Sequence, residues 1–114
     1  MAFDISIPDT LRINGFDWKV VVTDNLINTS DCFGVTDTVG QKIFLSQDTP
    51  PQNVICTLLH ELIHVIIWQG GLRNVIDRKE EEIIAAAVSQ GLYQVLKEND
   101  LFTQNPEEKK AVVV

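Results

Sequence analysis

Hydrophobic and polar positions alternate in the first half of the chain and follow a helical spacing in the second half. Residues 11–13 and 16–22 are rich in β-branched and aromatic side chains. They flank Asn14-Gly15, a dipeptide that readily takes the positive φ angles of a tight turn. This pattern predicts a β-hairpin, in which we expect Trp18 to lie in the sheet core rather than to form a substrate platform.

A second hairpin is predicted by residues 32–37 and 42–46, and Gly40 permits the turn between them. Residues 1–10 are expected to form an extended lead-in, and residues 23–31 a loop with one short helical turn. The two hairpins together predict a small antiparallel sheet.

Residues 53–68 are apolar around almost the whole circumference of a helix, a pattern that is typical of a buried helix. Asp48 or Thr49 is suited to cap the amino end, and the two prolines that follow suit the first turn. Gly70-Gly71 is a natural stop. We therefore expect one long helix packed against the sheet.

A second long helix is predicted from about Glu80 to about Asn99, because acidic residues at its start favour the positive end of the helix dipole. Its apolar stripe is expected to face the core and comprises Ile84, Val88, Leu92, Val95 and Leu96. Residues 105–114 lack such a pattern and are expected to be a flexible tail. Residues 1–104 should then form a single α+β domain.

The 114 residues carry a formal net charge of −7, which argues against nucleic acid or an anionic membrane as the main partner. The amino-terminal residues lack the basic and apolar regions of a signal peptide, so we expect the protein in the cytoplasm. In that reducing compartment the two cysteines, Cys32 and Cys56, are expected to remain free thiols.

The first helix carries the candidate chemistry in His60-Glu61-Leu62-Ile63-His64, which has the H-E-x-x-H form of a zinc-peptidase helix. His64 should lie about 40° around the helix from His60, with Glu61 about 60° beyond it. Two imidazoles one turn apart can bind the same Zn²⁺, while the adjacent carboxylate reaches the water bound by the metal. Burial of these groups costs desolvation energy unless a metal or other partners compensate.

Two other interpretations of this helix remain open. The pair of histidines, the only two in the chain, could be core residues with a glutamate between them by chance. Cys56, one turn earlier, could be a further ligand, although a small buried thiol is the alternative.

A catalytic zinc usually has three protein ligands, and no third histidine exists, so a cysteine or carboxylate must serve. On the second helix Glu81 falls near the centre of the apolar stripe. Glu82 lies at its edge, beside the small residues Ala86 and Ser89 that would let the two helices pack closely. Both glutamates could also be simple charges at the amino end of the helix. Spacing alone leaves the choice open.

With these two helices the chain resembles, over residues 43–96, the gluzincin metallopeptidases, and among them the small ImmA/IrrE-type proteins of bacteria, phages and mobile elements. In that group a ligand glutamate follows on the next helix in an E-x-x-A-N setting, which the run from Glu82 is similar to. The resemblance implies a minimal zincin-like domain with Zn²⁺ bound by His60, His64 and Glu82. It also implies that Glu61 is the general base for hydrolysis of a peptide or protein substrate, such as a regulator of a phage or mobile element.

One departure from the family is Ala86, which stands where an Asn or Asp commonly holds a ligand histidine. Loss of such a partner can weaken metal binding or activity by about 10- to 100-fold, unless Asp77, Asn74 or a backbone carbonyl takes the role. This departure favours an alternative, a non-catalytic zinc-binding module for protein interaction. A further alternative is a metal-free remnant, whose stability a chelator would not change.

Two further expectations concern the reaction. Tyr93, the only tyrosine, is a candidate oxyanion donor, but it lies roughly 16 Å from Glu82 by helix rise, which favours a partly buried aromatic on the helix face. The resemblance also implies that an edge strand beside the motif helix binds the substrate as an added strand. Residues 43–46 are the candidate for that strand.

Overall fold

The computed structural model describes residues 7–24, 33–47 and 49–99. These residues form a four-stranded sheet and two long helices joined by a short 3₁₀ turn, so the predicted α+β class is confirmed. Several expectations lie outside the described residues: the start of the lead-in, the helical turn after residue 24, Cys32, Asp48 and the tail at 105–114.

The first predicted hairpin is confirmed. Strands β1 (Thr10–Ile13) and β2 (Phe16–Thr23) pair antiparallel. Asn14 and Gly15 make the turn between them with φ angles of 50° and 86°. Trp18 is 0% exposed, so it is a core residue as expected.

The second predicted hairpin is also confirmed, by strands β3 (Gly34–Asp37) and β4 (Lys42–Ser46), which pair antiparallel. Its turn differs from expectation, because Gln41 rather than Gly40 takes the positive φ angle, at 52°. The backbone N–H of Gly40 instead donates to Asp37 Oδ1 at 3.0 Å, and a Cβ at Gly40 would lie 2.6 Å from the other carboxylate oxygen.

The sheet is mixed rather than antiparallel throughout, with strand order β1-β2-β4-β3. The two hairpins are joined by a parallel pairing of β2 with β4, in which Val20 lies opposite Ile43. After β2 the chain crosses to the far edge to form β3 and then turns back, so β4 runs in the direction of β2. The expectation that residues 43–46 form an edge strand is therefore wrong, and the edges are β1 and β3.

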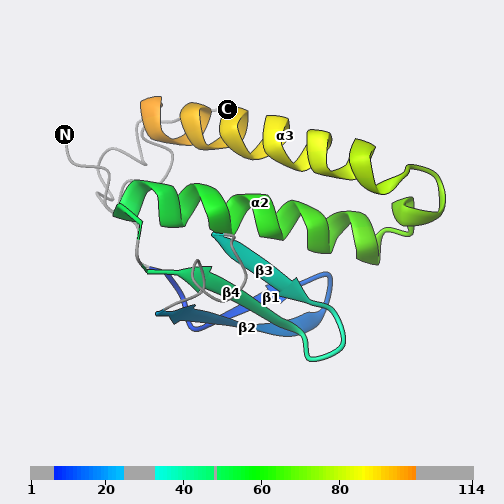
Figure 1. Cartoon of the computed structure of the whole chain (residues 1–114), viewed down its shortest axis with the longest axis horizontal. Coiled ribbons are helices and arrows are strands. Elements are labelled where there is room, and N and C mark those ends of the chain that lie inside the picture. The colour runs from blue at the N-terminus through cyan, green and yellow to red at the C-terminus, as the bar shows by residue number, and fades with distance from the viewer. Residues whose placement is uncertain (1–6, 25–32, 48, 100–114) are drawn as a thin grey trace, which may run out of the picture.

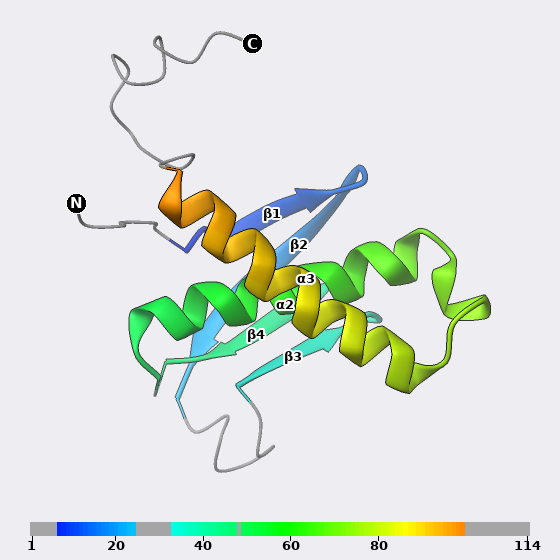
Figure 2. The same cartoon turned by 90° about the horizontal axis from the view of Figure 1, so that it is seen from above.

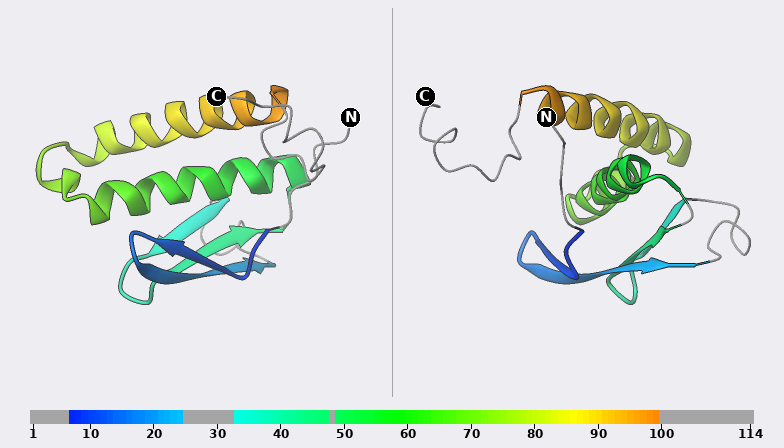
Figure 3. Two further views of the ribbon diagram at one scale, coloured as in Figure 1. Left: turned by 180° about the vertical axis from the view of Figure 1, so that it is seen from behind. Right: turned by 90° about the vertical axis from the view of Figure 1, so that its left-hand side faces the viewer.

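Helix α2 (Pro51–Gln69) lies across one face of the sheet, and α3 (Arg78–Glu98) covers the other side of α2, as Figures 1 and 3 show. The core lies between the sheet and α2 and comprises Ile13, Trp18, Val20, Ile43, Leu45, Val54, Leu58 and Val65. The helix is not buried on all sides as expected, since Ile66 is 50% exposed. Figure 2 shows α3 crossing over α2, which leaves part of α2 uncovered.

Of the two predicted ends of α2, the structure confirms the stop but not the cap. Pro50 itself occupies the cap position and no side chain caps the helix, so the expectation of a Thr49 cap is wrong. The hydroxyl of Thr49 donates to the carbonyl of Ser46 instead, at 3.4 Å. The predicted stop is confirmed: Gly70 N–H donates to a carbonyl one turn back, and Gly71 has a φ angle of 76°. A 3₁₀ turn, η1 (Leu72–Asn74), follows.

Helix α3 begins at Arg78, two residues before the expected start, because Asp77 caps it. The Asp77 carboxylate accepts from the backbone N–H of Glu80 at 2.7 Å, and the Glu80 carboxylate accepts from that of Asp77 at 3.0 Å. Glu80 is thus half of a reciprocal capping pair, which satisfies two backbone donors at the helix end.

The apolar stripe of α3 does not face the core as expected. Ile84, Val88, Leu92 and Val95 are between 38% and 52% exposed. The buried face of the helix consists instead of Glu81, Ala85 and Ser89. The small side chains allow α3 to approach α2 closely, and this approach brings the charged groups of the two helices together.

Candidate metal centre

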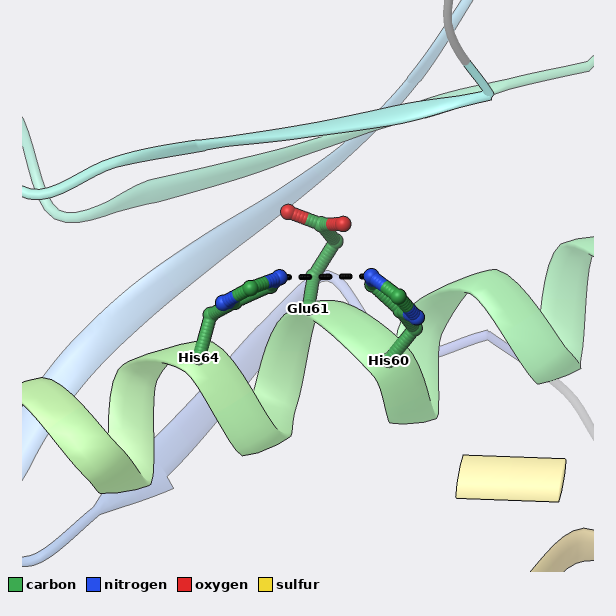
Figure 4. A group of neighbouring side chains, drawn as sticks. All are labelled: His60, Glu61 and His64. Atoms are coloured by element: carbon green, nitrogen blue, oxygen red, sulfur yellow. Dashed lines mark hydrogen bonds between the residues drawn. The ribbon is translucent and has the colours of Figure 1, made fainter. Parts of the chain in front are cut away.

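His60 and His64 lie one turn apart on α2 and turn their Nε2 atoms towards each other (Figure 4). The two Nε2 atoms are 3.2 Å apart, and the ring centroids are 4.9 Å apart. Both imidazoles are mostly buried, with side chains 23% and 14% exposed. Helix α2 thus places two imidazole nitrogens close enough together to bind the same metal ion.

Glu82 of α3 reaches both histidines. Its Oε1 lies 2.9 Å from His60 Nε2, and its Oε2 lies 3.0 Å from His64 Nε2. The structure therefore brings together the three residues proposed as ligands, two nitrogens from one helix and a carboxylate from the next. Nitrogen and carboxylate donors at such spacing are a set that a divalent metal ion accepts.

Glu61 completes a group that could hold a metal ion, since its nearest carboxylate oxygen and one nitrogen each of His60 and His64 all lie within 4.8 Å of one another. Its carboxylate points towards the strands (Figure 4), and Oε1 accepts a hydrogen bond from the hydroxyl of Thr36 at 2.7 Å. Glu61 is only 7% exposed. It is thus held beside the two imidazoles by a residue of β3.

Glu81 lies on the Nδ1 side of His64 and is only 5% exposed. Its Oε2 lies 2.6 Å from Nδ1 of His64, on the opposite edge of the ring from Glu82. Arg73 of η1 donates to both of its oxygens, from Nε at 3.0 Å and from another guanidinium nitrogen at 3.2 Å. Burial alone would raise the pKa of Glu81, but the bonds and charges of Arg73 and His64 outweigh it, so the pKa is lowered. The geometry is that of a partner to His64, not of a third ligand.

A cleft of about 900 Å³ opens beside these residues, between β3, α2 and α3. On the strand side it is lined by Gly34, Val35 and Thr36. A Cβ at Gly34 would lie 2.6 Å from Thr57 Cγ2 and 3.2 Å from Glu61 Cγ, so only glycine lets β3 lie this close to α2. An edge strand thus forms one wall of the cleft that contains the site.

Arg78 lines the same cleft, one turn before Glu82 on α3. Its side chain is exposed, and within the described residues it makes no hydrogen bond or ion pair. A cation at the amino end of a helix opposes the helix dipole, so this position does not serve helix stability. Arg78 is therefore a charge available to a bound molecule.

Tyr93 and Cys56 stand apart from the ligand group. Tyr93 is not among the residues that line the cleft, and its ring lies 5.8 Å from the ammonium of Lys97. Burial, and then the nearby Cys56, raise the pKa of Tyr93. Cys56 lines the cleft but is not part of the ligand group, and burial raises the pKa of its thiol. The structure therefore does not bring Tyr93 to the site as an oxyanion donor.

Sequence reasoning missed the parts played by Thr36, Arg73 and Arg78. No local pattern marks them, because each reaches the site from a strand, a connection or a helix start. Glu81 did carry a signal: a glutamate at the centre of an apolar stripe must find a partner when it is buried. The position of Glu81 in the apolar stripe was compatible with two roles, a metal ligand and an acceptor of hydrogen bonds from other side chains.

No protein-family model, curated protein or solved structure matches this chain. No helix in the part of the chain that the structure describes is long and apolar enough to cross a membrane. The site residues and their geometry therefore carry the functional argument.

Proposed function

We propose that this protein is a zinc metallopeptidase of the gluzincin type. The observation that carries the proposal is the convergence of His60 Nε2, His64 Nε2 and the Glu82 carboxylate, with separations of 2.9 to 3.2 Å. Atoms bound to one tetrahedral Zn²⁺ at about 2.0–2.1 Å lie roughly 3.3 Å apart, so this donor set fits that ion. His60, His64 and Glu82 would hold it.

The second part of the proposal is a hydrolytic role for Glu61. When bound, the ion would supply Lewis-acid chemistry, the polarisation of a water molecule and of the scissile carbonyl. Glu61 would take the proton from the attacking water and pass it to the leaving amine. Its hydrogen bond to Thr36 fixes the carboxylate for this transfer. A site that only holds a metal has no need of such a base.

The substrate in this proposal is an extended peptide that lies along β3. Among the residues that the structure describes, β3 pairs with β4 alone, so its other edge has backbone groups that a peptide could pair with. This edge forms a wall of the cleft and carries Thr36, which contacts Glu61. Arg78 replaces Tyr93 as the candidate donor to the developing oxyanion, because it lines the cleft and has a free guanidinium within the described residues.

The runner-up is a non-catalytic zinc-binding module, and one observation favours it. Of the three buried residues that attach α3 to α2, Glu81, Ala85 and Ser89, only Ala85 is apolar. A metal shared by the two helices would stabilise that attachment without any reaction. Glu61 and the cleft beside it favour the enzyme instead.

The test begins with elemental analysis of the protein purified with and without added zinc, and of His60→Ala. We expect about one zinc per chain, lost in the variant. Hydrolysis of a mixed library of internally quenched peptides is then compared between the native protein and Glu61→Gln, which keeps the shape of the side chain. The proposal expects zinc in both proteins and hydrolysis only in the first. Zinc without hydrolysis in either would favour the non-catalytic module, and no zinc in either would overturn both.

A further inference from the structure

The site has a partner for His64 that the sequence did not predict. Ala86 cannot orient a histidine, yet His64 Nδ1 lies 2.6 Å from Glu81 Oε2. The side chain of His64 is 14% exposed and that of Glu81 is 7% exposed, so water has little access to this contact. A ligand histidine commonly donates its second ring N–H to a carboxylate, and this contact has that form.

The contact determines how the ring of His64 is turned. An ionised carboxylate only accepts hydrogen bonds, so Nδ1 is the donor to Glu81. Nε2 is then the atom that faces His60 and Glu82, at 3.2 and 3.0 Å. Nε2 is therefore the nitrogen that a metal ion shared with His60 and Glu82 would bind.

Arg73 in turn holds Glu81. The guanidinium donates one bond to each carboxylate oxygen, which is a paired geometry that Lys cannot reproduce. Glu81 and Glu82 are neighbours and could compete for the same ion. With both oxygens of Glu81 engaged by Arg73, Glu82 remains the carboxylate free to bind it.

We propose that Arg73 and Glu81 form a positioning pair, which holds His64 at Nδ1 so that Nε2 faces the metal, and leaves Glu82 as the ligand carboxylate. The pair takes the place of the polar residue that Ala86 lacks. This inference rests on the metal site of the proposed function but not on the hydrolysis.

The first measurement is the exchange with water of the Nδ1–H proton of His64, from ¹⁵N-resolved NMR of the imidazole in metal-free protein. We expect slow exchange in the native protein and in Glu81→Gln, whose amide oxygen can still accept the bond. In Glu81→Ala we expect much faster exchange, because no acceptor holds the proton. Equally slow exchange in Glu81→Ala would overturn the proposal.

The second measurement is zinc affinity by competition with a chromophoric chelator. We expect about 10- to 100-fold weaker binding in Glu81→Ala and Arg73→Met, and a smaller loss in Arg73→Lys. The surface variants Arg12→Met and Glu98→Gln serve as controls with unchanged affinity. Native affinity in Glu81→Ala would overturn the proposal and leave the proposed function intact.

Arg73→Met leaves a buried carboxylate without its cation and could unfold the protein. The double variant Arg73→Met/Glu81→Gln removes both charges and is the safeguard; thermal melting checks its fold. We expect it to bind zinc as weakly as Arg73→Met, and native affinity would overturn the role of the pair. Native protein that binds no zinc would overturn the proposed function, while faster exchange of the His64 Nδ1–H proton in Glu81→Ala would still support the positioning of His64 by Glu81.

Discussion

The hydroxyl of Thr36 on β3 donates a hydrogen bond of 2.7 Å to the carboxylate of Glu61 on α2. This bond joins the cleft wall to the proposed general base. Thr36→Val keeps the shape and removes the donor, so Glu61 loses its fixed orientation. We expect hydrolysis to fall roughly 10-fold or more, because small misplacement of a reacting group is costly. Zinc content should not change.

The matched control for this bond is Thr36→Ser, which keeps the hydroxyl and should retain most of the activity. Steady-state rates and elemental analysis on the three proteins make the comparison. Full activity in Thr36→Val would show that Glu61 needs no support from β3.

Gly34 is predicted to be intolerant of a side chain. In Gly34→Ala the new Cβ would lie 2.6 Å from Thr57 Cγ2, so β3 must move away from α2. We expect a loss of about 1–3 kcal/mol in the free energy of unfolding, measured by urea denaturation. Adding Thr57→Ser removes the clashing methyl and should restore part of the loss.

Gly91 provides the control for that experiment, since a Cβ there meets nothing within 4 Å. Gly91→Ala lies inside α3 and should stabilise the protein by about 0.5–1 kcal/mol, because glycine is a poor helix former. Equal effects at the two glycines would contradict the close approach of β3 to α2.

Arg78 is predicted to act on substrate but not on the metal. In Arg78→Gln we expect hydrolysis to fall by about 100-fold, the scale seen when one oxyanion donor is removed. Zinc affinity should stay within the error of the control Lys79→Gln, the neighbouring charge that does not line the cleft. A variant that loses zinc and activity together would assign Arg78 a structural role instead.

The two faces of α3 should respond differently to substitution. Ala85 is 0% exposed, so Ala85→Leu should overpack the interface with α2 and cost about 1–3 kcal/mol in the free energy of unfolding. Val88 is 47% exposed, and Val88→Ala should change stability by less than about 0.5 kcal/mol. A larger loss of stability in Val88→Ala than in Ala85→Leu, measured by urea denaturation, would show that the apolar stripe packs in the core after all.

The Cys56 thiol provides a pH-dependent readout. Burial raises its pKa, an effect larger than the opposing charge of Lys97, so the thiolate is scarcer at a given pH than in an unfolded chain. Alkylation by iodoacetamide should therefore be slow at pH 8 and should accelerate at a higher pH than in the denatured protein. Cys32→Ser leaves Cys56 as the only thiol for this measurement. Coinciding pH profiles would contradict the burial.

Local patterns predicted the local structure well. The Asn14-Gly15 turn, the two hairpins, the stop at Gly70-Gly71 and the H-E-x-x-H helix all depend on neighbours in sequence. These features require only the intrinsic preferences of turns and helices. The carboxylate of Glu82, expected as a ligand from a resemblance as much as from spacing, does lie beside the histidines, and its role as a ligand stays a prediction.

Relations between distant segments were harder to predict. The parallel pairing of β2 with β4 is set by where the chain crosses the sheet, which no local pattern encodes. The apolar stripe with Val88 at its centre predicted the wrong buried face of α3, because the most apolar face of this helix is not the one that packs. The hydrogen bonds of Arg73 and Thr36 join residues that only the folded chain brings together, so the spacing of residues in the sequence does not reveal them.

The buried face of α3 also bears on how the site responds to temperature. Hydrophobic contacts weaken on cooling, and the core between the sheet and α2 depends on them. The position of Glu82 depends instead on small side chains, a capped helix start and charged hydrogen bonds between α3 and its neighbours. Cold should therefore loosen the sheet core before it disturbs the arrangement of the ligand residues.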